Sequence, residues 1–365
     1  MSEWQTFCLK DLGKIVGSAT PSTNNPKNYG NKIAWITPKD LSTLQGRYIK
    51  KGSRSISRLG FKSCSCVLLP KHAILFSSRA PIGYVAIAKK RLCTNQGFKS
   101  IIPNKKIYFE FLYYLLKYHK DNISNIGGGT TFKEVSGATL GLFKVKIPPT
   151  YYEQQKIART LSILDQKIEN NHKINELLHT LAYKIYEYYF KYKPKNAKLE
   201  QIIIENPKSS IMVKNAQKTQ DKYPFFTSGD NILSYPKAII DGRNCFLNTG
   251  GNAGIKFYVG KASYSTDTWC ICANEFSDYL YLLLSNIKTH INQSFFQGTS
   301  LKHLQKNLLK KYPIYMPSAH EIKKFNQIIM PLLTLISINT RTSKKLEQIR
   351  DFLLPLLLKQ QVKPQ

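Results

Sequence analysis

Acidic residues and long apolar runs are both scarce in this chain. It has 22 Asp and Glu among 365 residues against 54 Lys and Arg, a formal net charge of +32 at pH 7. Such an excess predicts a polyanionic partner, either nucleic acid or an anionic membrane. The longest apolar stretch, residues 328–338, is interrupted by Pro331. Since a bilayer-spanning helix needs about 20 apolar residues, the sequence argues against a membrane-spanning protein.

Export and metal-binding signals are also missing. Residues 1–10 carry Glu3, Gln5 and Lys10 without the apolar segment of a signal peptide. The seven cysteines are odd in number, and the closest pairs, 64/66 and 270/272, are separated by one residue instead of two. This spacing argues against a zinc site. The odd number of cysteines fits a protein of a reducing compartment better than one held together by disulfides. We therefore expect a cytoplasmic protein without a metal site.

Composition and length indicate a folded protein of more than one domain. Hydrophobic residues make up 42% and charged residues 21%, close to ordinary globular usage. Wholesale disorder and collagen-like structure fit this composition badly. A chain of this length is expected to form two or three domains.

The second half of the chain repeats the first. Between residues 151 and 190, apolar residues recur at spacings of four and three, as in a heptad pattern. The pattern returns 168 positions later, with Asn171 and Asn339 at the same seam position. Upstream, residues 111–116 match 279–284, and a Gly-Thr loop and a strand ending in Pro follow in both halves. Each half thus predicts a globular region followed by a long helix.

The two helices are expected to pair. A helix of about 38 residues spans about 57 Å, more than one small domain needs, so we expect an antiparallel pair that holds a globular domain at each end. The predicted pairing positions are Ile157, Leu161, Leu164, Ile168, Asn171, Leu178, Phe325, Ile329, Leu332, Ile336, Asn339 and Leu346.

The two seam asparagines leave two interpretations open. Asn171 and Asn339 could fix the register of the helix pair, as a polar seam residue does in coiled coils. Alternatively, they could face solvent beside a wider apolar stripe that contains Ile174, Leu177 and Leu181.

Short β-like runs separated by Gly, Pro, Asn and Ser precede both helices and predict mixed sheets. The expected fold is α/β (α+β), with two globular domains separated by two long antiparallel coiled-coil helices in pseudo-two-fold symmetry. The expected regions are residues 1–150, 151–193, 194–317 and 318–362.

Charge distribution favours DNA over a membrane surface. Acidic and basic residues balance along residues 151–190, so the positive excess lies in the globular regions. A membrane-surface helix would instead concentrate Lys and Arg on its polar face. Two basic domains held apart suit two DNA segments separated by one or more helical turns of about 34 Å.

Several segments carry a family resemblance by their order along the chain. They are residues 17–22 (GSATPS), 34–41 (AWITPKDL), 77–83 (SSRAPIG), 94–98 (TNQGF), 127–132 (GGGTTF), 147–149 (IPP) and 153–169. The chain resembles the specificity subunits of type I restriction-modification systems over essentially its whole length. The second half departs from the pattern, because Lys222-Tyr-Pro-Phe-Phe-Thr-Ser-Gly229 stands where a Trp-Ile-Thr-Pro counterpart is expected.

The resemblance implies a non-catalytic subunit that binds a bipartite DNA target. Each target-recognition domain would read one half of the target, and the helices would set the spacer length. Two modification subunits would carry S-adenosylmethionine and methylate adenine, and ATP-dependent restriction subunits would cleave DNA. We therefore expect no cofactor on this chain, with S-adenosylmethionine, ATP and Mg on its partners, and no membrane partner.

Two alternatives stay open: a stand-alone DNA-binding or architectural protein, and a catalytic methyltransferase or nuclease. Ile147-Pro-Pro-Thr-Tyr151 resembles the loop of adenine methyltransferases, but Ile147 replaces the required Asn or Asp. Gly127-Gly-Gly129 lacks the spacing of a phosphate-binding loop. We therefore expect no catalytic residue.

Candidate DNA-binding residues follow from residue type and loop position. Arg and Lys suit guanine, Asn and Gln suit adenine, and Ser and Thr suit phosphate. Trp35, Phe98 and Trp269 are expected in the core instead. The candidates are Thr20, Ser22, Lys39, Ser78, Arg79, Gln96, Thr130 and Lys133 in the first domain and Thr227, Ser228, Asn231, Asn248, Asn252, Thr299 and Lys302 in the second.

Overall fold

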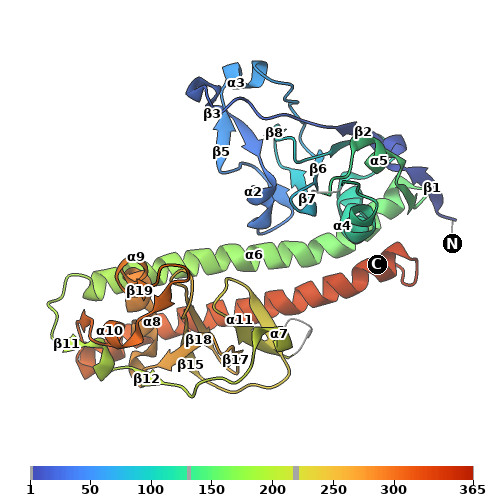
Figure 1. Cartoon of the computed structure of the whole chain (residues 1–365). Helices are drawn as coiled ribbons and strands as arrows, with labels where there is room; N and C mark the ends of the chain where they lie inside the picture. The colour runs from blue at the N-terminus through green and yellow to red at the C-terminus, as the bar shows by residue number, and fades with distance from the viewer. Residues whose placement is uncertain (1–2, 130–132, 217–221, 365) are drawn as a thin grey trace. The chain divides into compact units, whose positions relative to one another are not determined.

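The structure is a computed structural model that describes residues 3–129, 133–216 and 222–364 (Figure 1). Its contacts divide the chain into two compact units. Unit 1 comprises Met1–Glu169 and Leu346–Gln365, and unit 2 comprises Asn170–Lys345. Each long helix therefore contributes residues to both units. The division into four regions expected from the sequence stays a prediction.

Unit 1 is built on two main sheets. The five-stranded sheet has the order β2-β9-β6-β7-β4, the three-stranded sheet has the order β5-β3-β8, and β1 pairs with β10. The strands are β1 (Gln5–Cys8), β2 (Gly13–Val16), β3 (Tyr29–Ile36), β4 (Tyr48–Ile49), β5 (Arg54–Ile56), β6 (Ile74–Ser78), β7 (Ile82–Ala88), β8 (Cys93–Thr94), β9 (Ser100–Pro103) and β10 (Lys144–Ile147).

Helix α4 covers the five-stranded sheet. Alternate residues of β6, Ile74 and Phe76, are buried in one core cluster with Phe111 and Leu115 of α4. The helices of this unit, besides the long ones, are α1 (Leu9–Leu12), η1 (Pro26–Asn28), α2 (Pro38–Ser42), α3 (Arg58–Lys62), α4 (Phe109–Asn125) and α5 (Gly137–Leu142).

Unit 2 has its own sheets and core. Its four-stranded sheet has the order β12-β18-β15-β16, its three-stranded sheet has the order β14-β13-β17, and β11 pairs with β21 and β19 with β20. The strands are β11 (Ala197–Lys198), β12 (Ile204–Glu205), β13 (Tyr223–Phe226), β14 (Ile232–Tyr235), β15 (Arg243–Asn248), β16 (Ile255–Val259), β17 (Ser263–Tyr264), β18 (Thr268–Cys272), β19 (Phe296–Gln297), β20 (His303–Leu304) and β21 (Pro313–Ile314). The short helices are η2 (Leu199–Gln201), α7 (Val213–Ala216), η3 (Asn274–Phe276), α8 (Ser277–Asn286), α9 (Lys288–Ser294) and α10 (Lys306–Lys310).

The internal repeat extends to the topology of the sheets. In unit 1, Ile36 of β3 lies opposite Thr94 in a parallel pair, and in unit 2 Phe226 of β13 lies opposite Tyr264 in the same way. The segment after Phe226 is thus the structural counterpart of the segment after Ile36. Residues 222–229 thus lack the Trp-Ile-Thr-Pro motif but keep its backbone pairing, as expected of a variant of this segment.

The two long helices are α6 (Tyr151–Phe190) and α11 (Ala319–Leu358), each of 40 residues. Both begin with a hydroxyl N-cap, which satisfies a backbone N–H group that a helix start leaves free. The Thr150 hydroxyl accepts from the Glu153 N–H at 3.2 Å, and the Ser318 hydroxyl accepts from the Glu321 N–H at 3.3 Å. The two caps are repeat equivalents, so the same local signal starts both helices.

Within unit 2 the two helices run antiparallel (Figure 1). Asn171 donates to the Ser343 hydroxyl at 3.1 Å, and Asn339 donates to Asn175 at 2.9 Å. Both seam asparagines are half-buried, whereas Leu177 of the alternative apolar stripe is 71% exposed. The interpretation that the two asparagines face solvent is therefore wrong.

The predicted pairing positions are buried to different degrees, and their role in pairing stays a prediction. Ile157 and Leu161 belong to the core of unit 1, and Phe325 and Ile329 belong to that of unit 2. Buried positions are Ile157, Leu161, Ile168, Phe325, Ile329 and Ile336, and half-buried ones are Leu164, Asn171, Leu178, Leu332, Asn339 and Leu346.

In the part of the chain that the structure describes, no helix combines the length and the apolar character needed to pass through a bilayer. The three aromatic residues expected in the core, Trp35, Phe98 and Trp269, are all buried.

Candidate nucleic-acid interface

Three loops of unit 1 lie side by side at the end of β6. The backbone of Ser78 connects them, since its N–H donates to Gly97 at 2.8 Å and its C=O accepts from Val135 at 3.0 Å. The Thr20 hydroxyl donates to the Gln96 side chain, which brings a fourth segment to the same place. Four segments far apart in the sequence therefore form one loop cluster, called loop cluster 1 here: residues 17–22, 79–83, 94–98, and 127–129 with 133–135.

Arg79 is the half-exposed cation at the centre of loop cluster 1. Its guanidinium donates to Glu134 at 3.3 Å, and the Lys99 ammonium lies 3.3 Å from the other oxygen of the same carboxylate. Two cations thus share one anion, which leaves a positive balance toward solvent. Lys133, next to Glu134, is exposed. This arrangement suits phosphate or guanine, both of which present acceptors.

Helix α2 places Lys39 beside loop cluster 1. Its start is fixed by Asp40, whose carboxylate accepts from the N–H and the hydroxyl of Thr37 at 2.7 Å each. Burial acts to raise the pKa of Asp40, but hydrogen bonds from Ser53 and Thr37 hold that pKa below its ordinary value. A Cβ atom on Gly97 would lie 2.9 Å from Pro38, so glycine permits the close packing of α2 on the 94–98 loop. Lys39 itself is exposed.

Unit 2 has an equivalent cluster, loop cluster 2, formed by residues 227–231, 248–254, 265–268 and 298–303. The Ser228 hydroxyl donates to the backbone C=O of Asp267 and accepts from the Thr249 N–H at 3.2 Å. The Gly251 N–H donates to Lys302 at 2.9 Å, and the Leu304 N–H donates to Thr249 at 3.0 Å. The second Gly-Thr loop is therefore held against the β15–β16 turn.

Five of the seven second-domain candidates are accessible. Asn231, Asn252, Thr299 and Lys302 are exposed, and Ser228 is half-buried. In the first domain Ser22, Lys39, Gln96 and Lys133 are exposed and Thr20 and Arg79 are half-buried. Thr130 lies outside the described residues. Contact with DNA by these residues stays a prediction.

Three candidates are buried, which corrects the expectation of direct DNA contact. Ser78 is 0% exposed, and its hydroxyl donates to Gly97 at 3.3 Å. Thr227 and Asn248 are also buried, and they hydrogen-bond Asn231 and Asn252 within their own turns. All three are polar residues at loops, as expected from the sequence. Their exposure depends on tertiary packing, which the sequence does not show. In the structure, the side chains of these three residues are buried and hydrogen-bonded within the loops.

Lys256 is a structural residue of loop cluster 2 that sequence reasoning missed. Its ammonium donates to the Thr227 C=O at 2.8 Å and to the Asn248 side chain at 3.0 Å. Burial lowers its pKa. It therefore ties the 227–231 turn to the 248–254 turn, a role that only the fold reveals.

A second missed group is the basic row on β5 and α3. Arg54, Arg58 and Lys62 are exposed and four residues apart, and Lys50 and Lys51 precede them. The Arg54 guanidinium lies 5.9 Å from the centre of the Tyr29 ring. The signal in the sequence was the density of positive charge, with five basic residues and no acidic residue between positions 50 and 62, which suits a phosphate backbone.

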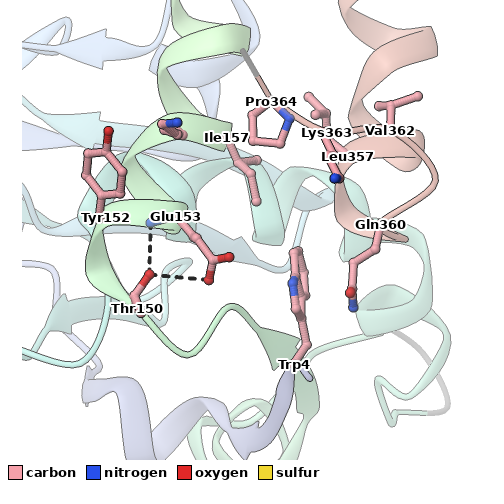
Figure 2. Close-up of a pocket in the computed structure, with 11 residues that line it drawn as sticks. Trp4, Thr150, Tyr152, Glu153, Ile157, Leu357, Gln360, Val362, Lys363 and Pro364 are labelled. Carbon is pink, nitrogen blue, oxygen red and sulfur yellow. Dashed lines mark hydrogen bonds between the residues drawn. The ribbon is translucent and has the colours of Figure 1, made fainter. Parts of the chain in front are cut away.

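A separate cavity of about 530 Å³ lies at the start of α6 (Figure 2). Its walls include Trp4, Tyr152, Ile157, Leu357 and Val362. Glu153, on the first turn of α6, also lines the cavity. Its carboxylate accepts a hydrogen bond from the Thr150 hydroxyl at 3.3 Å, next to the start of the helix. The cavity lining thus comes from Trp4, the start of α6 and the C-terminal segment, and none of its residues comes from loop cluster 1.

The methyltransferase-like segment has a structural role. Ile147 is buried at the end of β10, opposite Gln5, and the Pro148 C=O accepts from Gln154 at 3.3 Å. It is a strand end that leads into α6. Among the described residues, no group of three or more His, Cys, Asp or Glu side chains is arranged to hold a metal ion.

Two α/β domains of one topology, each with a polar and basic loop cluster and each followed by a long helix, define a two-domain DNA-recognition protein. The chain matches the model of the type I restriction modification DNA specificity domain over residues 1–180 and again over 195–348. The chain therefore belongs to the family of type I restriction-modification DNA-specificity subunits, which are non-catalytic DNA-recognition subunits.

Similarity to individual proteins supports this family assignment. The chain is 32% identical to the type I restriction enzyme MjaIX specificity subunit of Methanocaldococcus jannaschii, over 98% of this chain and 93% of that protein. It is 30% identical to the HindI specificity subunit of Haemophilus influenzae over 46% of this chain and 37% of the relative. The crystal structure of the type I S subunit of M. genitalium shares its fold, with a TM-score of 0.63, 18% identity and coverage of 97% and 96%.

Proposed function

We propose that this subunit recognises a DNA target of two separated blocks, and that each loop cluster reads one block. The observation that carries the proposal is the repetition of one loop architecture with different side chains. Arg79 and Gln96 lie in loop cluster 1 and Lys39 lies beside it. Asn231, Asn252 and Lys302 lie in loop cluster 2. Because Arg favours guanine and Asn favours adenine, two such clusters are expected to read different sequences.

Helices α6 and α11 would set the number of undefined base pairs between the two blocks. Each helix has 40 residues, so each spans about 60 Å. A helix of this length resists compression, and its length is fixed by the sequence. The separation of the two blocks would then be a property of the helices and not of the recognition loops.

The same helices would dock two modification subunits. Exposed apolar residues follow each helix at heptad-like spacings, and solvent-facing apolar rows of this kind mark helix-pairing surfaces. Leu181 of α6 and Ile349 of α11 are repeat equivalents and are both exposed, which supports one docking surface per helix. We call these residues the outer stripe: Ile174, Leu177 and Leu181 on α6 and Leu335, Ile338, Ile349 and Phe352 on α11.

The chemistry would reside on the partners. Modification subunits would bring S-adenosylmethionine and methylate adenine, and ATP- and Mg-dependent restriction subunits would cleave unmodified DNA. The chain itself would contribute DNA binding and a scaffold, without a cofactor of its own. Its place of action would be the cytoplasm, where the DNA and the partners meet.

Genome-wide mapping of methylated adenine tests the proposal without any guess about the target. Cells with and without this gene are compared, in the presence of the modification subunit genes. The expected result is loss of methylation at one motif of two short defined blocks with a fixed spacer. Unchanged methylation at every motif, together with failure to co-purify a methyltransferase, would favour a stand-alone DNA-binding protein instead.

A further inference from the structure

A buried network of charges surrounds Arg47 in unit 1. The Arg47 side chain is 3% exposed, and its guanidinium donates to Glu110 and to Glu169 at 3.1 Å each. Asp165 lies 3.9 Å from the guanidinium and pairs with Arg350 at 2.6 Å. Two arginines and three carboxylates are thus brought together from β4, α4, α6 and α11.

The network is satisfied by hydrogen bonds as well as by charge. The Tyr48 hydroxyl donates to Glu110, and the Tyr114 hydroxyl donates to Asp165. The Arg47 backbone N–H donates to the same Glu169 oxygen at 2.9 Å. Buried charges are tolerated only when they are paired and hydrogen-bonded in this way, so the geometry of the group is tightly constrained.

Gly46 brings the backbone close to α6. Its φ of +123° lies in the region that favours glycine, and a Cβ atom there would lie 3.1 Å from the Glu169 side chain. Residues 46 and 47 therefore bind α6 through backbone and side chain together.

The network is a feature of unit 1. The 168-residue repeat places Leu333, Ser337 and Ala182 at the positions of Asp165, Glu169 and Arg350. Strand β4 and the segment that carries Arg47 have no counterpart among the described elements of unit 2.

Unit 2 keeps a simpler contact. Asp278, the repeat equivalent of Glu110, pairs with Arg243, whose guanidinium also donates to Thr334 of α11 at 3.0 Å. The two domains are thus attached to their helices by different chemistry.

Strand β4 connects the network to the recognition loops. It pairs with β7, with Tyr48 opposite Ile87, and the Ile87 N–H donates to the Arg47 C=O at 2.8 Å. Strand β7 begins at Ile82, directly after the turn that carries Arg79. A displacement of β4 on α6 is therefore transmitted through one strand to the centre of loop cluster 1.

We propose that Arg47 is a positioning residue that fixes the first recognition domain on α6, and thereby restricts the spacer lengths that the subunit accepts. The inference rests on the proposed function, because it concerns the DNA target of two blocks. Loss of the guanidinium frees β4 from Glu110 and Glu169, and the domain then presents its loops over a range of positions. Arg47 need not touch DNA for this effect.

The test compares Arg47→Met and Arg47→Lys with Arg159→Met in the full chain. Arg159 is an exposed arginine on α6, so its variant controls for loss of one positive charge. Lysine keeps the charge but cannot donate in the forked geometry that reaches two carboxylates, so Arg47→Lys is expected to have an intermediate effect.

The first measurement is methyl-adenine mapping in cells that carry each variant and the modification subunits. Arg47→Met is expected to keep both sequence blocks and to add sites whose spacer is one base pair longer or shorter. Arg159→Met is expected to keep the original spacer. Methylation that falls uniformly at the original spacer, or does not change, would overturn the proposal.

The second measurement needs no DNA and is hydrogen–deuterium exchange of the purified full chain. Arg47→Met is expected to speed exchange of the Ile87 and Lys89 amides, which β4 protects, by more than about tenfold while β6 and β9 keep their protection. Equal acceleration across β6 and β9 would show a general loss of stability and would overturn the positioning role. If the wild-type protein yields no motif of two blocks, the proposed function fails, and local exchange at β4 still reveals whether Arg47 holds the domain.

Discussion

The side-chain amide of Asn339 donates a hydrogen bond to Asn175 at 2.9 Å, and the internal repeat maps this bond onto a second one, from Asn171 to Ser343 at 3.1 Å. Two equivalent polar contacts therefore mark the point in unit 2 where α6 and α11 pass each other. A polar pair among apolar seam residues is satisfied in one register only, because a shift along the helix would place each amide against apolar side chains.

Replacement of Asn339 by Leu is expected to destabilise the chain by about 1–3 kcal/mol, because the half-buried Asn175 oxygen loses its donor. Chemical denaturation measures the change. The exposed neighbour Asn170 provides the control as Asn170→Leu, which should change stability much less. The double change Asn175→Leu with Asn339→Leu should recover stability but broaden the mass distribution in light scattering. A double variant that stays a single species would argue against a role in register.

Arg350→Ala is expected to cost about 3–5 kcal/mol, since it leaves Asp165 buried without its closest cation. Unit 2 supplies a natural replacement, because Leu333 and Ala182 stand at the positions equivalent to Asp165 and Arg350. Combined Asp165→Leu and Arg350→Ala changes should therefore recover most of the loss in a thermal or urea titration. Equal destabilisation by the single and double variants would mean that Arg350 acts by packing and not by charge.

Arg79→Ala and Lys133→Ala are expected to weaken binding of a duplex that carries the mapped target, but in different ways. Loss of Arg79 should cost about 1–3 kcal/mol and relax base preference in one block, as for a base contact. Loss of Lys133 should weaken all sequences alike and lower the slope of log affinity against log salt by about 1. Titrations at several salt concentrations separate the two. Lys344→Ala, an exposed lysine of α11, is the control.

Leu177→Lys is expected to abolish co-purification with the modification subunit, because it places a charge in the outer stripe at its most exposed position on α6. DNA binding by the chain alone should be retained. Glu176→Lys changes charge at the adjacent exposed position and should leave assembly intact. If both variants lost co-purification to the same extent, the change in charge would be the cause and not the loss of an apolar contact.

Stability should fall in acid as Glu321 becomes protonated. The Ser318 N–H, the Tyr315 hydroxyl and Lys193 lower the pKa of Glu321 from 4.5 to about 2. The folded chain therefore binds fewer protons at this group than the unfolded chain does, so its contribution is full above about pH 4.5 and is lost as the pH falls toward 2. Glu321→Gln should remove this part of the pH dependence in unfolding curves at pH 2–6. An unchanged dependence would assign it to other carboxylates.

Local signals in the sequence sufficed for the helices and the repeat. The apolar spacing of four and three residues is read over a few neighbouring positions, which is why α6 and α11 could be predicted. The shared parallel pairing of Ile36 with Thr94 and of Phe226 with Tyr264 could not be predicted, because the side chains of the two segments differ.

The sequence by itself determined the family, the two-domain repeat and the positive charge, since each follows from residue order and composition. Only the tertiary structure decided which loop residues are accessible and what attaches the first domain to its helix. Ser78, Thr227 and Asn248 have the residue types of DNA contacts but are buried. The charged network around Arg47 connects the β4 segment with α4, α6 and α11, and no local sequence pattern predicts it. Burial and charge pairing arise when distant segments pack together, so they are properties of the folded chain.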